Sequence, residues 1–147
     1  MIVIGSDHAG LALKARVRAY LEQQGEELQD VGVYEARSCD YPDYALAVAR
    51  AVAGGAAERG VLVCGSGAGM AITANKVAGV RAVMCMTELQ ARLARAHNDV
   101  NVLCLGERLQ GEALALAVVE QFLRTPFEGG RHAARLGKIS AAEQGER

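Results

Sequence analysis

The chain has 147 residues, 51% of them hydrophobic and 22% charged, which fits one globular domain with a substantial core. Its formal net charge is −1, only 4% of its residues are aromatic and it has no Trp, so it lacks the basic surface and stacking platform that nucleic-acid binding requires. Because the sequence shows no charged leader with a following apolar segment and no run long enough to span a bilayer, we expect a cytoplasmic protein without membrane association.

Five short apolar runs have the length and composition of buried parallel strands. In chain order they are Ile2 to Gly5, Glu27 to Val31, Gly60 to Val63, Arg81 to Met86 and Asn101 to Leu105. Segments with helical spacing lie between them, so strand and helix alternate along the chain. This alternation predicts right-handed crossovers and a single-domain, Rossmann-like α/β fold, with a five-stranded parallel sheet and helices on both of its faces.

The predicted helices also follow in chain order. The first helix has Leu13, Val17 and Leu21 on its apolar side. The others span Tyr44 to Ala53, Met70 to Lys76, Leu89 to Ala96 and Glu112 to Leu123. Pro42 suits the first turn of the second helix, with Asp40 nearby to cap it. A basic piece from Glu128 to Ile139 follows. We therefore expect one domain over residues 1–139 and a frayed polar tail over residues 140–147.

A glycine-rich turn joins the third strand to the next helix. The run from Val61 to Gly69 reads Val-Leu-Val-Cys-Gly-Ser-Gly-Ala-Gly. Its glycines let backbone N–H groups approach an anion, and the positive end of the following helix favours the thiolate of Cys64. A tight connection with a cysteine that only fills the strand end is the equally weighted alternative. The spacing matches neither a Walker loop nor a dinucleotide fingerprint.

Two histidines occupy positions where they could take part in chemistry. Asp7 and His8 follow the first strand, where they could hold an anion or a sugar hydroxyl, although a helix N-cap with an exposed histidine is the commoner arrangement. His97, before Asn98, ends the helix after the fourth strand and could act as a general acid or base, or simply cap that helix. With three histidines and none spaced as ligands, we expect no metal site.

Three arginines are candidates for phosphate binding, and two of the remaining cysteines are candidates for the core. Arg131 and Arg135 are four residues apart after two glycines, which would present a fork to a phosphate, and Arg108 at the end of the fifth strand is a third possible partner. A solvated basic face is the plainer interpretation of the arginine pair. Cys85 and Cys104 lie among apolar residues and are expected to fill the core, and the absence of Cys-x-x-Cys spacing predicts free thiols.

Six motifs together resemble the sugar-phosphate isomerase family that contains ribose-5-phosphate isomerase B and the allose- and galactose-6-phosphate isomerases. They are Gly5-Ser6-Asp7-His8-Ala9-Gly10, Asp40-Tyr41-Pro42-Asp43-Tyr44, Cys64-Gly65-Ser66-Gly67-Ala68-Gly69 with Asn75-Lys76, His97-Asn98-Asp99, Gly106-Glu107-Arg108 and Phe127-Glu128-Gly129-Gly130-Arg131-His132. The resemblance runs in order from near residue 1 to about residue 139. It implies a metal-free and cofactor-free interconversion of ribose 5-phosphate and ribulose 5-phosphate, a step of the pentose phosphate pathway, through a cis-enediolate.

The resemblance also implies roles for individual residues. Cys64 would be the base, the N–H groups of Gly65, Ser66, Gly67, Ala68 and Gly69 would stabilise the oxyanion, and the Ser66 hydroxyl would relay protons. His97, assisted by Asp7, would open the sugar ring. His8, Arg108, Arg131 and Arg135 would bind phosphate, and Asn98 a sugar hydroxyl.

The family's sites lie between subunits, so the resemblance implies a homodimer or homotetramer whose partner chains share each site. Two alternatives stay open from the sequence. One is a six-carbon substrate such as allose 6-phosphate, because the motifs do not measure the length of the pocket. The other is a sugar-phosphate binding module, in which Cys64 would not be a base or would be a redox-sensitive thiol.

Overall fold

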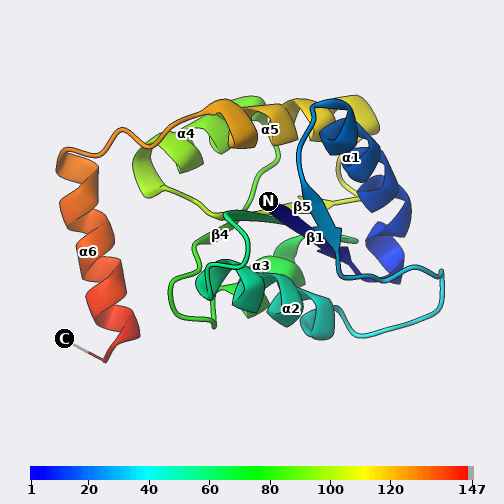
Figure 1. The fold of residues 1–147 in the computed structure, drawn as a ribbon, viewed down its shortest axis with the longest axis horizontal. Helices are drawn as coiled ribbons and strands as arrows, with labels where there is room; N and C mark the ends of the chain where they lie inside the picture. Colours follow the sequence, from blue (N-terminus) through cyan, green and yellow to red (C-terminus); the bar gives the residue numbers. More distant parts are fainter. Residues whose placement is uncertain (146–147) are drawn as a thin grey trace.

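The structure, a computed structural model, describes residues 1–145 and contains the predicted five-stranded, all-parallel sheet (Figure 1). Its strands are β1 (Ile2–Ser6), β2 (Leu28–Asp30), β3 (Arg59–Cys64), β4 (Ala82–Met84) and β5 (Val102–Gly106), in the spatial order β2-β1-β3-β5-β4. The register pairs Ile2 with Arg59 and Gly60 with Val102. The three central strands β1, β3 and β5 therefore end at the same edge of the sheet, and the polar residues that follow them are neighbours.

Helices cover both faces of the sheet, as predicted. They are α1 (Leu11–Gln23), α2 (Tyr41–Ala53), α3 (Ala68–Ala74), α4 (Glu88–Asn98), α5 (Glu112–Arg124) and α6 (Arg131–Glu143), with a short 3₁₀ turn, η1 (His8–Gly10), before α1. One apolar cluster joins α1, α4 and α5 to one sheet face, and a second joins α2 and α3 to the other (Figure 1). The alternating strand residues Val61 and Leu62 belong to opposite clusters, which is why the strands read as continuous apolar runs.

Helix α6 differs from the other helices because it stands apart, beyond the β4 edge of the sheet (Figure 1). Its final turn contacts the body through Glu143, whose Oε2 accepts the Gly79 N–H at 3.1 Å. Residues 140–143, expected to belong to a frayed tail, are therefore helical, because this contact and continued backbone hydrogen bonding extend the helix past Ile139. The last two residues of the expected tail, 146 and 147, lie outside the described residues. Among residues 1–145, no helix is long and apolar enough to cross a membrane.

Candidate active site

A cavity of about 400 Å³ opens where β1, β3 and β5 end. β1 and β3 are the pair at which the chain order reverses across the sheet, and such a switch point is where open α/β sheets bind ligands. The residues lining the cavity are Asp7, His8, Ala9, Tyr41, Cys64, Gly65, Ser66, Gly69, Arg108 and Leu109. The structure therefore brings together most of the site residues predicted near the strand ends.

Cys64 is the last residue of β3 and is 5% exposed. Its Sγ accepts a hydrogen bond from the backbone N–H of Gly67 at 3.1 Å. This N–H can approach the sulfur because Gly67 has a φ of +79°, a left-handed conformation that glycine adopts without strain, and it immediately precedes α3. The turn therefore directs a backbone hydrogen-bond donor at the sulfur atom that faces the cavity.

The two strand cysteines have a different environment. Cys85 and Cys104 are buried in the apolar clusters, which confirms that they fill the core. Burial raises the pKa of Cys85 to about 11 and also raises the pKa of Cys104. Both side chains are therefore neutral thiols at physiological pH, and neither lines the cavity that contains Cys64.

Asp7 and His8 enter the cavity from the end of β1. The Oδ1 atom of Asp7 accepts the N–H groups of Ala9 at 3.0 Å and Gly10 at 3.1 Å, so Asp7 is the N-cap of η1 as well as a cavity residue. His8 Nδ1 accepts the Cys39 N–H at 3.2 Å. In a neutral ring this bond leaves the proton on Nε2, so His8 retains a donor for a ligand.

Arg108 supplies the positive charge of the cavity. Its backbone N–H donates to the Gly65 carbonyl at 3.0 Å, which fastens the β5 end to the glycine turn. Its guanidinium lies so close to Gly65 that a Cβ there would be 3.3 Å from Nη1. The cation is thus held beside the turn that carries Cys64, where it can bind an anionic group.

Six predicted site residues do not line this cavity: Gly67 and Ala68, which belong to the glycine turn beside it, and four residues from the end of α4 and from α6. His97 and Asn98 end α4, and Asn98 borders a separate cavity of about 470 Å³ between the β4 edge and α6. Arg131 and Arg135 lie exposed on α6, which stands apart from the sheet (Figure 1). Within one chain, the predicted residues therefore form two separate groups.

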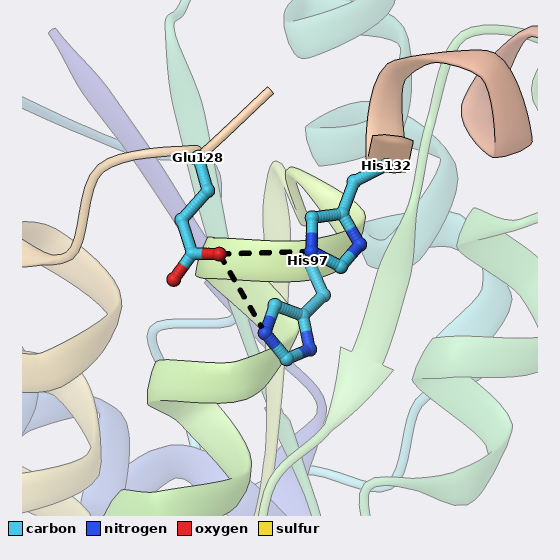
Figure 2. Close-up of side chains that lie close together, drawn as sticks. All are labelled: His97, Glu128 and His132. Atoms are coloured by element: carbon cyan, nitrogen blue, oxygen red, sulfur yellow. Dashed lines mark ion pairs between the residues drawn. The ribbon is translucent and has the colours of Figure 1, made fainter. Parts of the chain in front are cut away.

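His97 belongs to a cluster that sequence reasoning missed, shown in Figure 2. Its ring stacks on that of His132, with the ring centroids 4.3 Å apart and the planes 11° apart. The Oε2 atom of Glu128 lies 3.8 Å from His97 Nε2 and 3.6 Å from His132 Nε2. Burial, together with His97 and Arg131, lowers the pKa of His132. Glu128 and His132 stand in a quoted motif, but only the meeting of α4 and α6 places them against His97.

Tyr41 is a further residue that the sequence did not assign to the site. It begins α2 and lines the cavity, and its ring packs so closely on Gly69 that a Cβ there would lie 2.6 Å from ring atoms. The signal for it is its motif with Asp40 and Pro42, which contributes to the family resemblance but by itself predicts only the start of a helix. Tyr41 therefore contacts the glycine turn at Gly69, whereas Arg108 lies beside Gly65.

Comparison with known proteins identifies the family. The Ribose/Galactose Isomerase family model matches residues 2–139. Ribose-5-phosphate isomerase B of Escherichia coli (strain K12) is 47% identical over 143 residues, which cover 97% of this chain and 96% of that protein.

Solved structures agree with this assignment. The Clostridium thermocellum ribose-5-phosphate isomerase B superposes with a TM-score of 0.97 at 48% identity and covers 98% of this chain and 97% of its own. The Mycoplasma genitalium ribose-5-phosphate isomerase B with bound ribulose-5-phosphate gives a TM-score of 0.94 at 40% identity, over 97% of this chain and 95% of its own. The chain belongs to the ribose/galactose isomerase family.

Proposed function

We propose that this protein is a metal-independent aldose–ketose isomerase that interconverts ribose 5-phosphate and ribulose 5-phosphate in the cytoplasm, as part of the pentose phosphate pathway. The family and the ribulose-5-phosphate bound to the Mycoplasma genitalium relative support this reaction. The observation that carries the proposal is the hydrogen bond from the Gly67 N–H to Cys64 Sγ, inside a cavity that also contains His8 and Arg108. That arrangement offers a base and an anion site side by side.

The proposed chemistry is a proton transfer between two carbons. The Cys64 thiolate removes the C2 proton of the open-chain aldose, the C–H electrons form the C1–C2 double bond, and the C1 carbonyl oxygen becomes an oxyanion. Backbone N–H groups from Gly65 to Gly69 stabilise this cis-enediolate. The Ser66 hydroxyl carries a proton from O2 to O1, and the Cys64 thiol returns its proton to C1, which leaves the ketone at C2.

The remaining roles concern ring opening and binding. His8 and Arg108 bind the phosphate from within the cavity, and Arg131 and Arg135 contribute further charge. His97 opens the furanose ring with help from Asp7, whose Oδ2 is not used in the η1 cap. Asn98 binds a sugar hydroxyl.

We propose that a second copy of the chain completes each cavity. His97, Asn98 and both α6 arginines do not line the cavity of their own chain. A homodimer, alone or paired into a homotetramer, can bring the α4 end and α6 of one chain to the Cys64 cavity of its partner. This arrangement gives a use to a helix that stands apart from its own sheet.

The test follows ketose formation by the EDTA-treated protein from ribose 5-phosphate and, separately, from allose 6-phosphate. We expect ribose 5-phosphate to be the better substrate and Cys64→Ala to lower kcat by roughly 10²–10⁴-fold, the range for loss of a general base, while calorimetry still detects substrate binding. Cys85→Ala is the matched control and should keep the wild-type kcat.

Each other outcome has a definite meaning. Faster turnover of allose 6-phosphate would replace the substrate and leave the mechanism in place. Unchanged turnover in Cys64→Ala would reject Cys64 as the base. Binding without turnover of either sugar would favour a binding module.

A further inference from the structure

The cluster formed by His97, Glu128 and His132 has the composition of a metal site. One ligand atom from each residue, two imidazole nitrogens and one carboxylate oxygen, lies within 4.8 Å of the other two. The residues come from the end of α4, the loop before α6 and the first turn of α6, so their approach is a product of the fold (Figure 2). Both histidine Nε2 atoms lie near the same oxygen of Glu128 (Figure 2).

His132 provides a second, independent observation. Its side chain is only 8% exposed, and its Nε2 is buried without a hydrogen-bond partner among the described residues. Glu128 is near, but 3.6 Å is too long for a hydrogen bond. Leaving a buried nitrogen without a hydrogen bond is unfavourable, so a ligand that bonds to this nitrogen would stabilise the cluster.

The distances suit a divalent transition metal. Zn²⁺ binds imidazole nitrogen and carboxylate oxygen at about 2.0–2.2 Å, so tetrahedral ligands lie about 3.3 Å from one another. The distances from Glu128 Oε2 to the two histidine nitrogens, 3.6 and 3.8 Å, exceed this by a few tenths of an ångström, and the two nitrogens lie within 4.8 Å of each other. His97 and Glu128, with side chains 37% and 58% exposed within the single chain, can turn to shorten these separations.

We propose that His97, Glu128 and His132 form a site for a divalent transition metal such as Zn²⁺ or Co²⁺, and that the bound ion inhibits the protein. Two histidines and one carboxylate leave a fourth position open for water. The inhibitory effect rests on the proposed function of His97, because a nitrogen that is bonded to metal cannot exchange a proton with the sugar ring oxygen. The metal is thus an inhibitor of a reaction that does not use it.

Cobalt titration of the full-length protein tests the site without any activity measurement. We expect one Co²⁺ per chain, visible d–d absorption, and no sulfur-to-cobalt charge-transfer band from this site. His132→Asn and Glu128→Gln should each weaken this binding by at least about tenfold, in line with the sensitivity of metal sites to the loss of a supporting group. Glu128→Gln changes an exposed side chain, so it gives a result even if His132→Asn disturbs the docking of α6.

His8→Asn is the matched control, because it removes the one other histidine and should leave the nitrogen-and-oxygen spectrum unchanged. A charge-transfer band would report separate binding at a thiol such as Cys64 or Cys39, whose Sγ lies 3.8 Å from His8 Nδ1. The proposal is overturned if Co²⁺ gives only that sulfur band. It is equally overturned if the d–d absorption is the same in His132→Asn, Glu128→Gln and the wild type.

Inhibition by Zn²⁺ is then measured against the metal-free rate of each variant. We expect EDTA to reverse it and Glu128→Gln to raise the inhibition constant at least about tenfold. Cobalt binding at the cluster without zinc inhibition would uphold the site and overturn the inhibitory effect together with the proposed role of His97. If the isomerase test rejects Cys64 as the base, the cobalt titration still reports whether the metal site exists. The metal site and the isomerase mechanism can therefore be rejected independently.

Discussion

Gly67 is the residue on which the geometry of the glycine turn depends. Its φ of +79° directs its N–H at Cys64 Sγ, and α3 begins at the next residue. A Cβ at this position would come within 2.8 Å of Met84 Cγ and 3.2 Å of the Leu105 backbone. The turn therefore needs glycine both for its backbone conformation and for its contact with the neighbouring strands.

We predict that Gly67→Ala lowers both stability and activity. The left-handed conformation alone costs an L-residue about 1–2 kcal/mol, and the contacts with Met84 and Leu105 add to this. Any shift that relieves the contact moves the N–H away from Cys64, so kcat/KM should fall at least about tenfold, the effect of losing one well-placed donor. Urea unfolding and steady-state kinetics measure the two effects.

Gly79→Ala separates backbone strain from the chemistry. Gly79 has a similar φ of +85°, but a Cβ there would meet nothing within 4 Å. It should lose about the same 1–2 kcal/mol of backbone strain and keep wild-type kcat/KM. Equal losses of activity in the two variants would show that the turn acts through stability alone.

At the scale of elements, the sequence predicted the sheet well because burial on both faces leaves a clear pattern. All five strands fall within or beside their predicted apolar runs. Helix ends were less accurate: α2 begins at Tyr41, before the predicted Tyr44, with Pro42 in its first turn as expected. Asp40 occupies the N-cap position but forms no side-chain hydrogen bond there. Local propensity predicts that a helix is present more reliably than it predicts the residues at which the helix begins and ends.

The candidate site was predictable only in part, because the sequence indicates where strands end but not how separate helices and loops pack together. Residues that follow β1, β3 and β5 share a cavity because parallel strands end at one edge, so Asp7, Cys64 and Arg108 could be grouped from sequence. The packing of His132 on His97 depends on how the loop before α6 crosses the end of α4, and no periodicity encodes that crossing. The same holds for Tyr41, which reaches the cavity from the start of a helix.

Helix α6 carries a prediction of its own. Arg131 and Arg135 are exposed and form no ion pair within the described part of the chain, so replacing either should leave the free energy of unfolding nearly unchanged. If they bind the substrate phosphate, Arg131→Met and Arg135→Met should each raise KM at least about tenfold, because a charge-assisted hydrogen bond contributes about 1.5–3 kcal/mol. Steady-state kinetics with ribose 5-phosphate measure this.

Lys138→Met is the matched substitution, because Lys138 is an exposed cation on the same helix. It should leave KM within about twofold of the wild type, as expected for a screened surface charge. A KM raised equally in all three variants would indicate general attraction of the anionic substrate, and the assignment of the two arginines would fail.

At the scale of the whole molecule, the separation of the predicted residues into two groups is the main structural fact. Cys64, His8 and Arg108 line one cavity, whereas His97 and the α6 arginines lie outside it. Rearranging one chain to join them would require moving α6 away from Gly79 and His97 away from Glu128. The proposed symmetric dimer would join the two groups without such a rearrangement, because each chain would give one half-site and receive the other.

Complementation between two impaired variants tests this division. Cys64→Ala and Arg131→Met chains are co-refolded in equal amounts and assayed at substrate concentrations well below the KM of the wild type. Random pairing makes half of the dimers mixed, and each mixed dimer contains one site with an intact Cys64 from one chain and an intact Arg131 from the other. The mixture should therefore recover about a quarter of the wild-type rate.

A mixture of Cys64→Ala with Arg108→Ala is the control, because both residues line the cavity of a single chain. Mixed dimers of these two variants have one lesion in each cavity, so no intact site forms and the rate should stay at the average of the two parents. Recovery in this control would mean that Arg108 also acts across the interface. No recovery with Arg131→Met would place the whole site within one chain, and α6 would then need a different role.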